Sequence, residues 1–133
     1  MFASHLECPR CAKTYSCGQV VQLCECGSPL LVRYDLAGVA ASVSKEKIYS
    51  RVSSLWRYRE FLPVQDERHI VSLGEGMTPM LRLTRTGQAM GMTRLYMKDE
   101  GIIPTGTFKA RGAAVGVSKA LELGVKALAM PTN

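Results

Sequence analysis

Residues 94–130 read RLYMKDEGIIPTGTFKARGAAVGVSKALELGVKALAM, and this stretch decides the fold class. Residues 94–98 alternate between apolar and polar side chains, which is typical of a strand. Residues 108–124 predict a helix that ends at Gly124, because apolar side chains recur there at helical spacing. These positions are Ala110, Ala113, Ala114, Val117 and Leu121. Residues 125–130 form a short apolar run that suits a buried strand. Strand, helix and strand predict a parallel βαβ unit, and therefore an α/β fold.

The composition is that of an ordinary globular domain. Of 133 residues, 47% are hydrophobic and 21% are charged, which excludes disordered, collagen-like and low-complexity chains. No apolar run approaches the roughly 18 residues needed to span a bilayer. The opening MFASHLECPR lacks the apolar core of a secretory signal, so we expect a cytoplasmic protein without membrane contact. The net charge of +6 leaves nucleic acid open as a partner.

The chain divides into three parts. Residues 1–34 hold all five cysteines and are expected to form a small segment like a zinc ribbon. Residues 35–69 are rich in alanine, serine, lysine and arginine, and they predict a helical connector with one amphipathic helix around 45–61. Residues 70–133 read as alternating strands and helices, which indicates the start of an α/β domain.

Two tight cysteine pairs predict a metal site. Cys8 and Cys11 form a C-x-x-C pair, and Cys24 and Cys26 form a C-x-C pair further along the chain. Four thiolates can bind Zn²⁺ tetrahedrally and leave no position for a water, so the predicted zinc is structural rather than catalytic. Reduced cysteines without a metal are the alternative. Cys17 either replaces one ligand or remains a free thiol.

Lys109 lies in the first turn of the predicted helix, after a loop with two glycines. The loop is not a P-loop, because the lysine comes two positions too late after Gly106. A second glycine motif, Gly74-Glu75-Gly76, is not a dinucleotide fingerprint, because it lacks the third glycine. The positive end of a helix dipole disfavours a structural cation and favours the neutral, nucleophilic amine. Ligands of open α/β sheets bind where this loop lies, at the carboxyl ends of strands. The pattern suggests an amine that captures a carbonyl, and the alternative is a solvated lysine.

The residues around Lys109 resemble a known motif. Residues 105–112, TGTFKARG, are close to the P-T-G-S-F-K-x-R-G lysine motif of fold-type II pyridoxal-phosphate enzymes. Within that superfamily, the chain is most similar to the threonine synthase family. The likeness includes LGEGMTP at 73–79, KDE at 98–100, MPTN at 130–133, and the cysteine pairs followed by GSPLLVRYDL at 27–36.

This resemblance implies a pyridoxal-phosphate enzyme with an amino acid as its small-molecule substrate. It implies that Lys109 carries the cofactor on its amine and moves protons, with Phe108 packed beside the cofactor. It also implies that Thr78, Thr132 and Asn133 bind the substrate. The reaction would convert O-phosphohomoserine and water into threonine and phosphate, in a homodimer. The fold would be a three-layer arrangement of parallel βαβ units, and residues 70–133 would be the start of its catalytic domain.

The sequence has no counterpart of the glycine-rich loop that binds the cofactor phosphate in this family. We therefore expect these residues to be the N-terminal fragment of a longer enzyme, without turnover of its own. Two other fold-type II enzymes, threonine dehydratase and cysteate synthase, remain alternatives, because residues that discriminate between substrates lie mostly outside this stretch.

A zinc-ribbon module that binds nucleic acid is the alternative from another functional class. It would need the basic residues of the first two segments on one face, with Trp56 and Tyr58 stacking on bases. These basic residues are Arg10, Lys13, Arg33, Lys45, Lys47, Arg51, Arg57 and Arg59. Acidic neighbours such as Glu46 and Glu60 dilute their charge, so nucleic acid is the less favoured partner.

Overall fold

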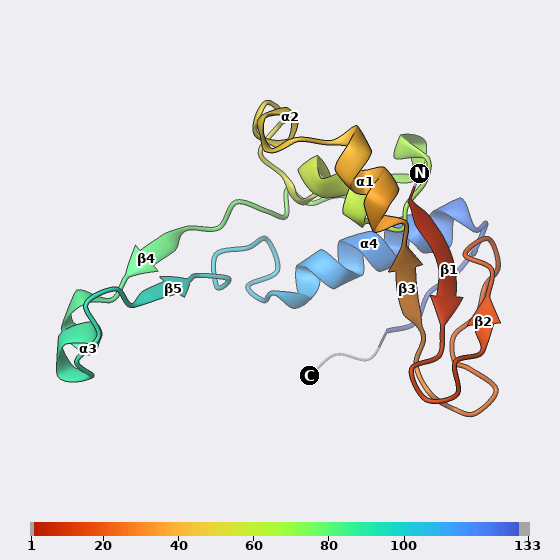
Figure 1. The fold of residues 1–133 in the computed structure, drawn as a ribbon, viewed down its shortest axis with the longest axis horizontal. Coiled ribbons are helices and arrows are strands. Elements are labelled where there is room, and N and C mark those ends of the chain that lie inside the picture. The colour runs from red at the N-terminus through yellow and green to blue at the C-terminus, as the bar shows by residue number, and fades with distance from the viewer. Residues whose placement is uncertain (1, 131–133) are drawn as a thin grey trace.

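The computed structural model describes residues 2–130 (Figure 1). The strands are β1 (Ala3–Glu7), β2 (Thr14–Tyr15), β3 (Leu31–Tyr34), β4 (Met80–Arg82) and β5 (Tyr96–Lys98). The helices are α1 (Leu36–Ser42), α2 (Lys45–Tyr49), α3 (Thr84–Ala89) and α4 (Lys109–Glu122), with the 3-10 segments η1 (Leu55–Phe61) and η2 (Glu67–His69). The chain combines helices and sheets, as an α/β fold requires. The predicted division after residues 34 and 69 stays a prediction.

The N-terminal sheet is antiparallel, with the strand order β2-β1-β3. Leu6 in the central strand lies opposite Tyr15 on one side and Val32 on the other. Two tight turns begin at the cysteine pairs, and each is closed by a backbone hydrogen bond of 2.9 Å. One runs from the Cys8 N–H to the carbonyl of Lys13 and the other from the Cys24 N–H to that of Ser28. The sheet thereby brings distant cysteines together.

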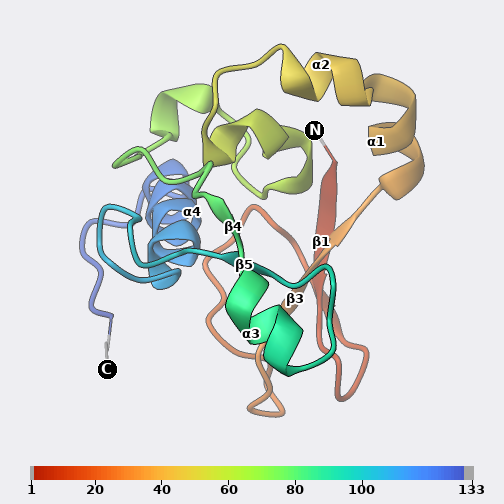
Figure 2. The same cartoon turned by 90° about the vertical axis from the view of Figure 1, so that its left-hand side faces the viewer.

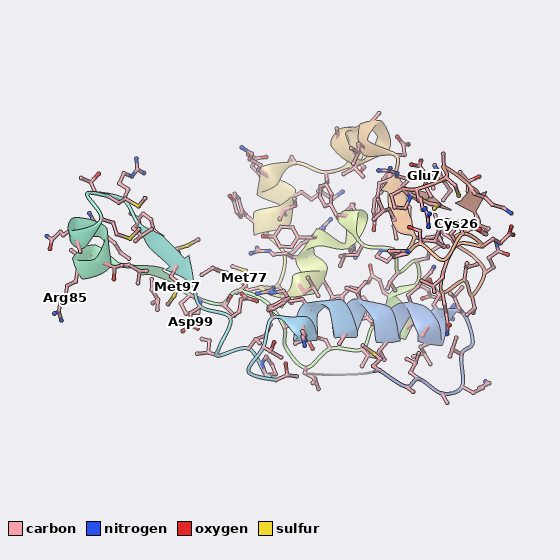
Figure 3. The ribbon with its side chains drawn as sticks, turned by 90° about the horizontal axis from the view of Figure 1, so that it is seen from below. Glu7, Cys26, Met77, Arg85, Met97 and Asp99 are labelled. Carbon is pink, nitrogen blue, oxygen red and sulfur yellow. The ribbon has the colours of Figure 1, made fainter. Side chains whose placement is uncertain are left out.

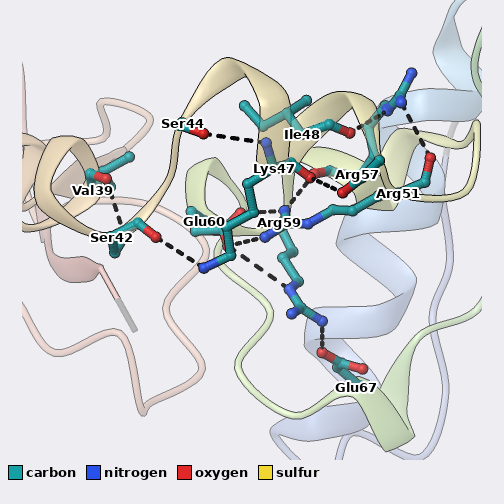
Figure 4. Close-up of polar contacts among 11 residues, drawn as sticks. Val39, Ser42, Ser44, Lys47, Ile48, Arg51, Arg57, Arg59, Glu60 and Glu67 are labelled. Carbon is teal, nitrogen blue, oxygen red and sulfur yellow. Dashed lines mark hydrogen bonds and ion pairs between the residues drawn. The ribbon is translucent and has the colours of Figure 1, made fainter.

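The prediction of a single helix around 45–61 is wrong. α2 ends at Tyr49, and η1 begins only at Leu55. The buried guanidinium of Arg57 donates to carbonyls at the end of α2 and just beyond it (Figure 4), at 3.2 Å to Ile48, 2.9 Å to Tyr49 and 3.1 Å to Arg51. A side chain therefore satisfies the carbonyls that a continuing helix would have bonded internally, and the helix stops there.

β4 and β5 form a second antiparallel pair, and α3 connects them. This arm projects away from the rest of the molecule (Figure 1), and Arg85 and Cys26 mark opposite ends in Figure 3. The predicted parallel pairing of residues 94–98 with 125–130 does not form, because residues 125–130 carry no strand. A strand exists only where a neighbour takes up its backbone hydrogen bonds, and β5 bonds to β4 instead.

α4 is the longest helix of the described residues, and Figure 2 views it nearly along its axis. Its buried side consists of Ala110, Ala114 and Ser118. The hydroxyl of Ser118 donates to the carbonyl of Ala114 at 2.7 Å and accepts from the N–H of Val71 at 2.9 Å, which fastens the helix to the preceding chain. Gly124 follows the helix with a φ of +74°, so the predicted glycine stop is confirmed. None of the helices in residues 2–130 has the length and apolar character of a bilayer span.

Candidate functional site

Lys109 is the first residue of α4 and follows the loop that leaves β5. Phe108, directly before it, occupies the N-cap position with φ −55° and ψ −19°. Both side chains are exposed, that of Phe108 to 65%. Gly106 turns the loop toward the helix with a φ of +69°, a conformation that glycine adopts at no steric cost. The prediction that Lys109 stands in the first helical turn after a strand and a loop is confirmed.

Arg111 connects the first turn of α4 to the end of β5. Its Nε donates to Oε2 of Glu100 at 2.6 Å and its Nη2 donates to Oε1 at 2.9 Å. The hydroxyl of Thr78 donates to the same carboxylate, and the amine of Lys98 donates to the carbonyl of Thr78. The hydrogen bonds from Arg111, and then from Thr78, lower the pKa of Glu100 to about 2, so this carboxylate is ionised at neutral pH. We call these residues the Arg111–Glu100–Thr78 cluster.

Of the three residues predicted to bind the substrate, the structure describes Thr78. Thr78 is buried, with 7% of its surface exposed, and its hydroxyl is bonded within the Arg111–Glu100–Thr78 cluster. Thr132 and Asn133 lie outside the described residues. Contact of these three residues with a substrate therefore stays a prediction.

The resemblance predicts that Glu75, like Thr78, lines the entrance of the active site, and in the structure Glu75 is a buried acid near α4. Its carboxylate accepts hydrogen bonds from the Ser72 hydroxyl at 2.6 Å and from the Leu73 N–H at 3.0 Å. Burial raises the pKa of Glu75, but these donors and the charge of Arg111 outweigh it, so the pKa is lowered. Together with Thr105 it lines a cavity of about 130 Å³ beside the first turns of α4. The serine and glycine beside Glu75 in the run SLGE at 72–75 favour this tight hydrogen-bonded turn.

The four predicted metal ligands come together. The Sγ atoms of Cys8, Cys11, Cys24 and Cys26 all lie within 4.8 Å of one another. Two sulfur pairs are at 3.5 Å, Cys8 with Cys26 and Cys11 with Cys24. A tetrahedron of thiolates bonded to zinc at about 2.3 Å has edges of about 3.8 Å, so these spacings fit a Zn²⁺ ion. Cys17 is buried and is not part of this group.

Hydrogen bonds lower the pKa of two of the four thiols, Cys8 and Cys24. Burial raises the pKa of Cys8, but the backbone N–H groups of Cys11 and Arg10 outweigh it and lower the pKa to about 6. The hydroxyl of Tyr15 donates to Cys24 Sγ at 3.2 Å and lowers the pKa of that thiol. Sequence reasoning missed Tyr15, although it stands four residues after the first cysteine pair, where the chain turns back toward the second.

Comparison with known proteins agrees with this geometry. Residues 71–132, which include Lys109, match the family described as "Pyridoxal-phosphate dependent enzyme". The chain is 47% identical to a threonine synthase of Methanocaldococcus jannaschii over 119 residues, which are 90% of this chain and 29% of the relative. It is 41% identical to a threonine synthase of Methanosarcina acetivorans over 126 residues, 94% of this chain and 30% of that relative. A threonine synthase of Halalkalibacterium halodurans is 42% identical over 80 residues, 56% of this chain and 22% of the relative.

The alignments with the first two relatives cover nine-tenths or more of the chain, so each includes parts of both residues 1–34 and α4. The chain spans about 30% of the length of these relatives. The lysine at the start of α4 and these likenesses lead to one conclusion. The chain is a homologue of threonine synthases, and its residues 71–132 match the family of pyridoxal-phosphate dependent enzymes.

Proposed function

We propose that this chain supplies the N-terminal part of a threonine synthase, which converts O-phosphohomoserine and water into threonine and phosphate. The observation that carries the proposal is the position of Lys109, an exposed primary amine at the first residue of a 14-residue helix within the family-matched region. The names of the relatives favour threonine synthase over threonine dehydratase and cysteate synthase. The region 70–133 would begin the three-layer catalytic domain.

The residues at this site fit pyridoxal phosphate. Lys109 supplies a primary amine and the preceding residue, Phe108, an exposed aromatic ring, both at the N-terminal end of α4, where the helix dipole favours an anionic group such as a phosphate. When bound, the cofactor supplies an aldehyde for the amine and an electron sink for the reacting carbon. Lys109 Nζ would hold the cofactor and then carry protons to and from the substrate. Phe108 would cover one face of the cofactor ring and exclude water from it.

The Arg111–Glu100–Thr78 cluster would hold this amine in place. The two hydrogen bonds from Arg111 to Glu100 close the ends of the loop that leads to Lys109. A lysine that must reach one carbon atom benefits from a fixed helix start, because a misplacement of about 1 Å can cost two orders of magnitude in rate. Thr78, Thr132 and Asn133 are proposed to bind the amino-acid substrate, Thr78 after exchanging its bond to Glu100 for one to the substrate.

A chimera tests the proposal. Residues 1–133 replace the matching region of the M. jannaschii threonine synthase, and phosphate release from O-phosphohomoserine is measured. We expect activity, with borohydride fixing a pyridoxyl group on Lys109 as mapped by mass spectrometry. Lys109→Ala should abolish both, whereas Lys126→Ala, at an exposed lysine in the same part of the chain, should leave both intact. A folded, active chimera whose Lys109→Ala variant still releases phosphate contradicts the proposal.

We also propose that the cysteine cluster holds a structural zinc ion. The close sulfur spacing supports this, and four thiolates leave no open position for catalysis. The free cysteines support a reducing, cytoplasmic compartment, and the resemblance to threonine synthases supports a homodimer for the whole enzyme. Light scattering of the chimera tests the dimer.

We infer that nucleic acid is not a partner of this chain. The basic residues that such a module would need are largely engaged within the protein. Lys13 pairs with Glu25, Arg33 with Glu7, Arg51 with Glu60 and Arg59 with Glu67, and Arg57 is buried against carbonyls. Binding to a DNA oligonucleotide that weakens steeply with salt would contradict this inference.

A further inference from the structure

Tyr15 is the side chain that links the cysteine cluster to the N-terminal sheet. It ends β2 and pairs with Leu6 across the sheet. Its hydroxyl donates to Cys24 Sγ at 3.2 Å and accepts from the N–H of Glu25 at 3.1 Å. One phenol oxygen therefore contacts a sulfur and the backbone amide that follows it, inside the turn that carries the second cysteine pair.

The aromatic ring of Tyr15 also contacts the side chain of Lys13. The amine of Lys13 lies 5.8 Å from the ring centroid, close enough for a cation–π contact. The same amine pairs with the carboxylate of Glu25 at 2.6 Å. The phenol of Tyr15 is therefore held by the pairing of β2 with β1, by the amine of Lys13 and by the two hydrogen bonds of its hydroxyl. These contacts direct the hydroxyl at Cys24.

We propose that Tyr15 is a positioning residue of the metal centre, which holds the Cys24 thiolate toward the ion and strengthens metal binding. This inference rests on the proposed structural zinc but not on the proposed enzyme activity. A hydrogen bond to a thiolate orients the ligand and favours the deprotonated form that the metal requires. Loss of such an outer contact typically costs between about 10-fold and 100-fold in metal affinity.

The test compares metal binding by the 133-residue chain and its Tyr15→Phe variant, which keeps the ring and loses only the hydroxyl. Co²⁺ serves as the spectroscopic probe and Zn²⁺ is measured by competition. We expect one metal ion per chain in both proteins, about 10-fold weaker Zn²⁺ affinity in the variant, and a shifted sulfur-to-cobalt charge-transfer band. Tyr34→Phe, in β3 of the same sheet, is the matched control and should change neither quantity.

A purely structural role for the phenol would lower thermal stability without moving the charge-transfer band. An unchanged band with affinity within twofold of the parent chain therefore overturns the proposal. If Tyr15→Phe fails to fold, Tyr15→His, which keeps a ring with a hydrogen-bond donor, should bind metal more tightly than Tyr15→Leu, and equal affinities contradict the proposal. A parent chain that binds no Co²⁺ overturns the metal centre and the role of Tyr15 together, while the chimera experiment on Lys109 remains unaffected.

Discussion

Arg111 and Glu100 face each other across the base of the loop that leads into α4, joined by two hydrogen bonds of 2.6 and 2.9 Å. One residue belongs to the first turn of the helix and the other follows β5. A bidentate pair of this kind fixes both distance and orientation, because the planar guanidinium matches the carboxylate. The start of α4, and with it Lys109, is thereby tied to the hairpin arm.

Breaking this pair should loosen the helix start. In Arg111→Met we expect amide hydrogen exchange across residues 101–110 to accelerate by about an order of magnitude, because Glu100 loses its main donor. Arg111→Lys keeps the positive charge but cannot donate two parallel hydrogen bonds to the carboxylate, so its effect should be intermediate. Arg85→Met, at the far end of the arm (Figure 3), is the control. Unchanged exchange in Arg111→Met would show that the pair does not order this loop.

Glu60 should make stability depend on acid pH. Arg51 donates to both of its oxygens at 2.6 and 2.7 Å (Figure 4), and these bonds lower the pKa of Glu60 from 4.5 to about 2. A depressed folded-state pKa stabilises the protein above the unfolded pKa, and this contribution is lost as pH falls from about 4.5 toward 2. Because the side chains of Arg51 and Glu60 are largely buried, solvent screens their interaction little, and the lowered pKa corresponds to about 3 kcal/mol of folding free energy.

Urea unfolding of the parent chain and Glu60→Gln at several pH values measures this contribution. At pH 7 the variant should be less stable by about 3 kcal/mol, since Arg51 loses its charged partner. The difference between the two proteins should shrink as the pH falls from about 4.5 toward 2, where Glu60 is protonated in the unfolded chain and half protonated in the folded protein. A difference that stays constant with pH would show that the carboxylate charge is not responsible.

Gly76 should not tolerate a side chain. Its φ is +139°, and a Cβ there would lie 2.7 Å from the backbone N of Leu55 and 2.8 Å from the carbonyl carbon of Ser54. The same N–H of Leu55 donates to the carbonyl of Glu75 at 2.7 Å, so the two segments cannot separate without losing this bond. Gly76→Ala should destabilise the chain by more than about 2 kcal/mol.

Gly74→Ala separates backbone strain from the steric clash. Gly74 also has a positive φ, +89°, but a Cβ there would meet no atom within 4 Å. Its replacement should cost about 1 kcal/mol, the strain of the left-handed conformation alone. Thermal unfolding measures the stability that each variant loses. Equal losses in Gly76→Ala and Gly74→Ala would mean that the contact of a Cβ with Ser54 and Leu55 adds nothing to the cost of backbone strain.

Metal removal should selectively disorder the N-terminal sheet. Chelation with EDTA should abolish the exchange protection of β1 and β3 while α4 keeps its protection, because thiolates without an ion repel one another and the binding free energy of the metal is lost. Cys8→Ser should abolish stoichiometric Zn²⁺ binding. Cys17→Ser should retain one ion per chain, since Cys17 lies outside the cluster. Retention of zinc by Cys8→Ser together with its loss in Cys17→Ser would contradict this ligand assignment.

Local patterns were enough to predict the helix that begins at Lys109, its glycine stop at Gly124 and the grouping of four cysteines. Each depends on neighbours in the chain or on closely spaced pairs. The helix around 45–61 was mispredicted because the periodicity continues across Tyr49, whereas Arg57 reaches back to bond the carbonyls there. Spacing alone does not reveal that a side chain ends a helix from eight residues away.

The sequence by itself determined the chemistry that this protein can offer, namely an amine at a helix start and thiolates in two pairs, because residue types and short spacings are written in it. Only the tertiary structure decided which groups meet. It joined Glu100 to Arg111, directed the hydroxyl of Tyr15 at Cys24, and paired β5 with β4 instead of residues 125–130. These choices depend on which backbone and side-chain donors find partners across long stretches of chain, and that competition is settled in three dimensions.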